Sequence, residues 1–72
     1  MTDRYLIIIE ATGTGYSACA PDLPGCEATG KTREEAESIM AEAVTRYVDG
    51  LRREGLQVPR PRCRATYVEV SL

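Results

Sequence analysis

The sequence predicts an α+β domain in which three short strands precede one long helix and a fourth strand follows it, in the order βββαβ. Apolar residues recur at helical spacing between positions 36 and 51, and β-branched residues gather at residues 4–10 and 64–70. Glycines and prolines divide the chain before the helix into short segments. A chain of 72 residues forms one domain, residues 1–72, and buries only about 60% of the surface that its unfolded chain exposes.

Three segments before the helix are predicted strands. Residues 4–10 read RYLIIIE, and their β-branched side chains suit a pleated strand. Because apolar residues fall on both of its faces, we expect one face to be covered by the helix and the other by a further element or a second subunit. The turn ATGTG leads to a strand at residues 16–20, and the PDLPG break leads to a strand at residues 26–29. Together they form an antiparallel meander.

Both ends of the helix are marked in the sequence. Thr32 is the predicted N-cap, and Glu35 completes a capping box in which each side chain binds the other residue's backbone amide. Gly55 suits the left-handed position after the last turn, where Leu56 folds back onto Leu51. The stripe predicted to face the sheet consists of Ala36, Ile39, Met40, Ala43, Val44, Tyr47, Val48 and Leu51.

The last predicted strand, residues 64–70, reads RATYVEV and alternates between two faces. The helix before it is long enough for a crossover connection. We therefore expect this strand to lie parallel to the first one, at its free edge, with a right-handed crossover.

Composition restricts where the protein works and what it binds. A formal net charge of −2 argues against a surface that binds nucleic acid as a whole. The three cysteines are an odd number, and we find neither a secretory signal nor a run of about 20 apolar residues, so we expect a cytoplasmic protein without a membrane partner. Because small domains without staples gain stability by association, we also expect a homo-oligomer, at least a dimer.

Cysteines and carboxylates are the residues that suggest chemistry. Six residues separate Cys19 from Cys26, which allows a cross-strand disulfide, but the histidines and close ligand pairs of zinc sites are missing. Small buried or half-buried cysteines are the favoured interpretation, and we expect neither a metal nor a cofactor. Glu10, Asp22 and Glu27 lie near strand ends, where a ribonuclease H-type site gathers carboxylates around magnesium. Solvated turn residues explain them more simply.

Two segments are candidate contact surfaces. The loop residues Asp22, Leu23, Pro24 and Gly25 either shape the sheet or, with Leu23 exposed at the tip, present a stiff contact to a partner. Arginines late in the chain suit phosphates or an acidic protein surface, or else form a solvated connector that complements the helix dipole. They are Arg52, Arg53, Arg60, Arg62 and Arg64.

The contiguous run PDLPGCEATGKTREEA, set between a tyrosine-containing meander and a long amphipathic helix, resembles the HicB-like family of antitoxins. The resemblance extends from about residue 5 through the last predicted strand. It implies a partly degraded ribonuclease H-like fold without nuclease activity, and hence a protein that is not an enzyme. It also implies a HicA-like toxin as partner, which cuts messenger RNA and whose active site the antitoxin covers.

The sequence departs from the family pattern at two places. Lys31 stands where an acidic residue is usual, which changes the charge at the start of the helix and leaves the cap intact. The chain ends at Leu72, directly after the last predicted strand, so we expect no C-terminal DNA-binding module and no direct DNA binding. Two alternatives stay open, a divalent-metal-dependent nuclease on the same scaffold and a solitary homo-oligomeric protein without a toxin partner.

Overall fold

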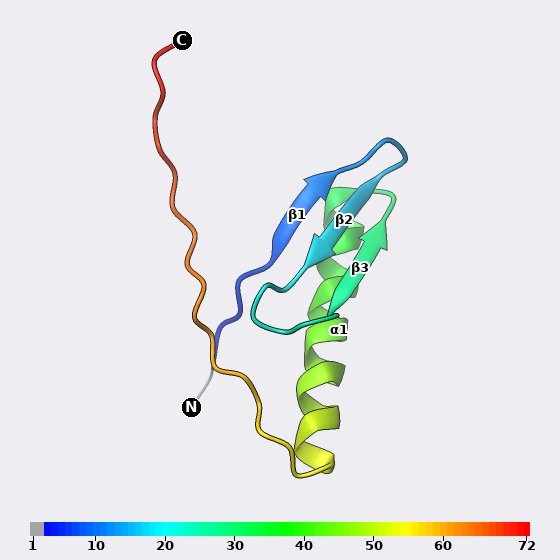
Figure 1. Cartoon of the computed structure of the whole chain (residues 1–72). Coiled ribbons are helices and arrows are strands. Elements are labelled where there is room, and N and C mark those ends of the chain that lie inside the picture. The colour runs from blue at the N-terminus through cyan, green and yellow to red at the C-terminus, as the bar shows by residue number, and fades with distance from the viewer. Residues whose placement is uncertain (1–2) are drawn as a thin grey trace.

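The computed structural model describes residues 3–72, which form three strands followed by one helix (Figure 1). The elements are β1 (Ile8–Ala11), β2 (Tyr16–Cys19), β3 (Glu27–Gly30) and α1 (Arg33–Arg53). Both strand pairs are antiparallel, and the sheet order is β1-β2-β3. The predicted α+β class, meander and helix are confirmed.

The first strand is shorter than predicted because its neighbour ends. The register places Ile8 of β1 opposite Cys19, the last residue of β2. The chain then turns toward β3, and the Ala20 amide donates to the Cys26 carbonyl oxygen at 3.2 Å. Residues 4–7 therefore precede β1 without a hydrogen-bonded strand beside them among residues 3–72.

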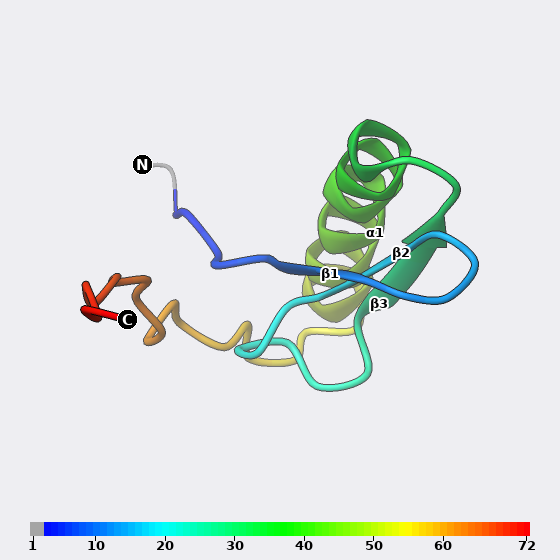
Figure 2. The ribbon, with the colours of Figure 1, turned by 90° about the horizontal axis from the view of Figure 1, so that it is seen from above.

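The helix covers one face of the sheet (Figure 2). Ile9, Ala18 and Ala28 lie opposite one another across the three strands and pack into the core below α1. The neighbouring residues point to the other face, because side chains alternate along a strand. Ile8 lies on that face and is 48% exposed. Within residues 3–72 no further element covers this second face, and its coverage by a second subunit stays a prediction.

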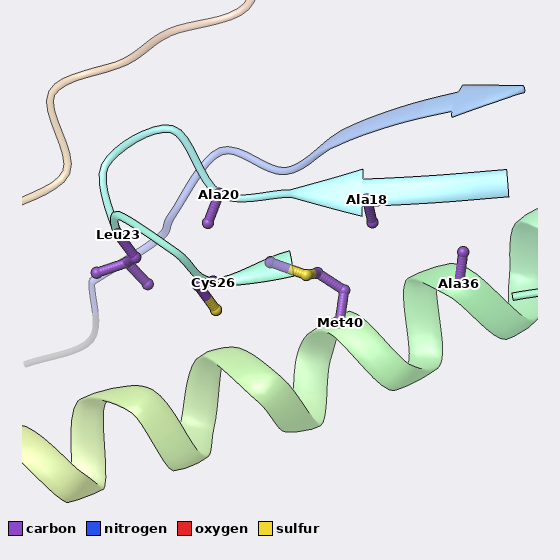
Figure 3. Packing of buried hydrophobic residues seen from close by; sticks show 6 residues of the cluster. All are labelled: Ala18, Ala20, Leu23, Cys26, Ala36 and Met40. Carbon is purple, nitrogen blue, oxygen red and sulfur yellow. The ribbon is translucent and has the colours of Figure 1, made fainter. Parts of the chain in front are cut away.

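The core is small and includes the loop between β2 and β3. It consists of Ala18, Ala20, Leu23, Cys26, Ala36 and Met40 (Figure 3). Leu23 and Met40 are its largest fully buried side chains. The small residues around them let the sheet, the loop and the helix approach closely.

The start of the helix differs from the predicted capping box in one contact. The Thr32 hydroxyl oxygen accepts the Glu35 amide at 3.0 Å, as expected of an N-cap. The Glu35 carboxylate accepts the amide of Lys31 at 3.1 Å instead of the Thr32 amide. The Glu35 carboxylate therefore binds the backbone amide of the residue before the N-cap and not that of the N-cap itself.

The end of the helix forms the predicted motif. Gly55 has φ 71°, and the Leu56 amide donates to the Leu51 carbonyl oxygen at 2.9 Å. Ile39 departs from the predicted stripe, because it lies at the flank of the helix and is 41% exposed. No helix within residues 3–72 is both long and apolar enough to cross a bilayer.

The structure differs most from the sequence-based expectation at the predicted fourth strand. Residues 64–70 form no strand, and the chain leaves the body of the domain after Cys63 as an exposed extension (Figure 1). We call residues 64–72 the tail. A strand exists only where its backbone amides and carbonyls pair with a neighbour, and within one chain the tail does not meet the outer edge of β1. The ribonuclease H-like architecture, which requires this strand, stays a prediction.

Candidate partner-binding site

Asp22 joins the two segments that the sequence suggests as contact surfaces. Its Oδ2 accepts the backbone amides of Arg62 at 2.9 Å and Cys63 at 3.0 Å. The Cys63 thiol donates to Oδ1, with 3.3 Å between sulfur and oxygen. The loop after β2 and the arginine segment after the helix, about 40 residues apart in the chain, therefore meet at one point. We call Asp22 and its contacts with Arg62 and Cys63 the clamp.

These contacts determine the charge of the clamp. Hydrogen bonds from the Cys63 and Arg62 amides hold the pKa of Asp22 below its usual range, because they stabilise the ionised carboxylate. The same pairing raises the pKa of the Cys63 thiol, since the thiol form donates to Asp22 and a thiolate beside it would be repelled. At neutral pH the clamp is a carboxylate that receives three donors.

The loop itself is built from two successive turns. The Leu23 amide donates to the Ala20 carbonyl oxygen, and the Cys26 amide donates to the Leu23 carbonyl oxygen, both at 3.0 Å. Gly25 supplies the positive φ of 80° that the second turn requires. Leu23 is fully buried, so of the two interpretations of this loop the one with Leu23 exposed at the tip is wrong.

The exposed part of the loop is its far side. Pro24 and Gly25 lie at the surface, and the Tyr47 hydroxyl of α1 donates to the Pro24 carbonyl oxygen at 3.0 Å. Leu23 inside the core and Tyr47 outside it thus hold the loop from two sides. Such a loop loses little conformational entropy when a partner binds.

A cleft of about 790 Å³ opens beside the clamp, between residues 4–7 and 61–65. The Tyr5 hydroxyl ties these two segments together by donating to the Pro59 carbonyl oxygen at 2.6 Å. Arg62 and Arg64 line the cleft, and Arg4 joins them from the other end of the chain. No linear pattern connects Arg4 with the later arginines, so sequence reasoning missed it.

The remaining arginines of the predicted patch lie apart from this cleft. Arg52 and Arg53 are exposed in the last turn of α1, where they complement the helix dipole. Arg60 is exposed on residues 54–63, which lead back from the helix and which we call the connector. The predicted patch is therefore divided into a helix-end part and a cleft part.

The residues considered for chemistry do not converge. Cys19, Cys26 and Cys63 are all free thiols, and burial raises the pKa of Cys26. Glu10 lies on β1, opposite Ser17 of β2, whereas Glu27 lies on β3 at the opposite edge of the sheet. Within residues 3–72, His, Cys, Asp and Glu side chains form no group of three that could hold a metal ion.

The comparison with known families decides what kind of protein carries this site. A family described as HicB-like antitoxin of bacterial toxin-antitoxin system matches residues 5–70. The chain belongs to the HicB-like antitoxin family. The match covers the meander, the clamp, the helix and most of the tail, so all of these are parts of the HicB-like domain.

Individual relatives agree with this assignment. A UPF0150 protein of Thermoplasma acidophilum is 36% identical over 58 residues, which are 79% of this chain and 84% of that protein. A UPF0150 protein of Synechocystis is 37% identical over 58 residues, or 79% of this chain and 73% of that protein. An uncharacterised protein from the rep-hol intergenic region of Haemophilus phage HP1 is 34% identical over 56 residues, but these are only 42% of its length.

Proposed function

We propose that this HicB-like domain neutralises a HicA-like toxin by binding over the toxin's active site. The observation that carries the proposal is the family match over residues 5–70, which includes every element of the described fold. A HicB-like antitoxin acts within a toxin-antitoxin system, and covering a partner requires a preorganised surface. The clamped loop and the cleft arginines supply such a surface.

In this proposal the residues at the clamp have different roles. Pro24 and Gly25 contact the toxin directly, because they are the exposed side of a loop fixed from two directions. Asp22 and Leu23 are positioning residues, one holding the arginine segment and the other anchored in the core. Arg62 and Arg64 pair with carboxylates of the toxin, for which the guanidinium fork is well suited.

The decisive experiment combines the purified protein with a HicA-type toxin encoded beside it and measures RNA cleavage and complex formation. We expect an equimolar amount of the protein to stop cleavage and to elute with the toxin as one complex. Unchanged cleavage with no complex on size exclusion would contradict the proposal. It would then favour the solitary homo-oligomeric alternative.

Charge reversal tests which surface binds. The double variant Arg62→Glu and Arg64→Glu should weaken toxin binding by about 10- to 100-fold, since each charged hydrogen bond contributes roughly 1.5–3 kcal/mol before compensation. The double variant Lys31→Glu and Arg33→Glu is the matched control, because it makes the same change of four charges at the exposed start of α1. Equal weakening by both variants would show that net charge, and not the clamp surface, governs binding.

A further inference from the structure

The tail and the two edges of the sheet are left without backbone partners among residues 3–72. In the tail, Tyr67 is 96% exposed and Val68 is 82% exposed, although both suit a strand. None of the hydrogen bonds found within residues 3–72 involves a residue after Cys63. On the sheet, β1 and β3 are the edge strands, and within residues 3–72 neither pairs with another strand on its outer side. Of the two, β1 carries an exposed large apolar side chain, Ile8. Unpaired edges of this kind are where another strand adds.

The tail and the edge do not close on each other in one chain because the connector directs them apart. Pro59 and Pro61 stiffen the connector, and the Tyr5 and Asp22 hydrogen bonds fasten it to the body of the domain. Beyond Cys63 the tail runs away from the sheet in both views (Figures 1 and 2). A short, rigid link before a strand favours exchange between copies over closure within one copy.

We propose that the protein is a strand-exchanged dimer, in which residues 64–70 of each copy pair with the outer edge of β1 in the other copy. The exchange is reciprocal, so it closes under two-fold symmetry and leaves neither tail unpaired. It supplies between copies the fourth strand that is missing within one chain. The family match extends to residue 70, so the exchanged segment is part of the HicB-like domain itself.

The surface involved is sufficient for a specific dimer. Each tail carries four large exposed apolar side chains, Tyr67, Val68, Val70 and Leu72. Eight such side chains bury on the order of 1,000 Å² before the covered edge is counted. Specific interfaces bury about 1,200 Å² or more in total, a size reached once Ile8 and the backbone of β1 are included.

The first test measures mass and backbone protection together on the full chain. Light scattering at micromolar concentration should give a dimer, and amide hydrogen exchange should show protected amides within residues 65–70. A monomer with protected tail amides would mean closure on the same chain, and it would overturn the proposal. A monomer with unprotected amides, or a dimer whose tail amides exchange freely, would overturn it as well.

The second test changes one tail residue. Val68→Asp should weaken the dimer about 100-fold, because the exchange buries this position twice and each buried valine contributes about tenfold. Its matched control is Ile39→Asp, which places the same charge on an exposed β-branched residue of α1 and should leave the dimer intact. Dissociation by Ile39→Asp but not by Val68→Asp would locate the interface on the helix and refute the exchange.

The third test identifies what the tail pairs with. A chain that stops after Arg64 keeps every core residue, so it should fold and remain monomeric. Mixed with the full chain, it should form a heterodimer that native mass spectrometry resolves by mass, because one tail can still pair with the edge of the shortened copy. Homodimers of the full chain without any heterodimer would mean that tails pair with tails, contrary to the proposal. None of these tests involves a toxin, so they stand apart from the proposed function.

Discussion

Asp22 and Leu23 are neighbours in the chain, but their side chains point in opposite directions. Leu23 points into the core, whereas the Asp22 carboxylate points outward and binds the connector after the helix. Asp in a loop is usually explained by local turn chemistry. Here its hydrogen bonds run to residues about 40 positions away, so it links distant segments of the fold.

The Asp22 clamp should open in acid. Because its pKa is lowered in the folded protein, the stabilisation is complete above the pKa of an unfolded aspartate and is lost as the pH falls through the lower folded value. NMR titration of the Arg62 and Cys63 amides should therefore report a transition below the ordinary aspartate range. In Asp22→Asn the same amides should no longer show that transition. A midpoint at or above the ordinary range would contradict the clamp.

Leu23→Ala should destabilise the domain by about 2–5 kcal/mol, because it leaves a cavity in a core whose largest fully buried side chains are Leu23 and Met40. For a domain of this size that is a large part of the total stability. Urea unfolding followed by circular dichroism measures the change. Pro24→Ala, next to it on the exposed side of the loop, is the control. A cost below about 0.5 kcal/mol for Leu23→Ala would show that the loop is not part of the core.

At the scale of elements, the helix is secured by its ends and the sheet by its contact with the first helical turn. Thr32 caps the start of α1, and Gly55 and Leu56 close its end. The last residue of β3, Gly30, lies against this first turn. A Cβ added to Gly30 would lie 2.6 Å from the Ala36 nitrogen, so β3 and α1 approach as closely as backbones allow.

Gly30→Ala should therefore cost about 1–3 kcal/mol of unfolding free energy, because either β3 or the start of α1 must shift. Gly13→Ala is the matched control, since nothing lies within 4 Å of a Cβ at that position. Chemical denaturation of both variants compares them directly. Equal stability of the two variants would mean that the close approach of β3 to α1 is not maintained in solution.

At the scale of the whole molecule, the fold is elongated, and residues 3–72 lack the fourth strand that the sequence predicts. Its extents are 49 × 27 × 19 Å, and the tail contributes much of the length. The helix has 21 residues but each strand has four, so α1 extends past the sheet it covers. Because so small a core supplies limited stability, we expect association of the kind proposed above to add to it.

The midpoint of thermal unfolding should therefore rise with protein concentration, because dilution favours separated chains. Differential scanning calorimetry across about a hundredfold range of concentration measures the dependence. Val68→Asp should unfold at a midpoint that does not vary with concentration. A wild-type midpoint independent of concentration would show that association does not contribute to stability.

The features predicted correctly from sequence are those that depend on neighbours along the chain. The helix, its N-cap and its C-terminal motif follow from residues within one or two turns of each other. The meander follows from turn residues between short apolar segments. The family resemblance likewise depends on a contiguous run of residues, and the match over residues 5–70 confirms it.

The features that sequence reasoning missed depend on residues far apart in the chain. Whether Leu23 faces solvent or the core, and whether Asp22 binds its own turn or the connector, depends on where the helix and the connector pass. Arg4 joins Arg62 for the same reason. The sequence by itself determined the three strands, the helix with its caps, and the alternation that favours a strand in the tail. Only the tertiary structure decided that the tail has no strand partner among residues 3–72, because strand pairing depends on the position of a neighbouring edge and not on the propensity of the segment.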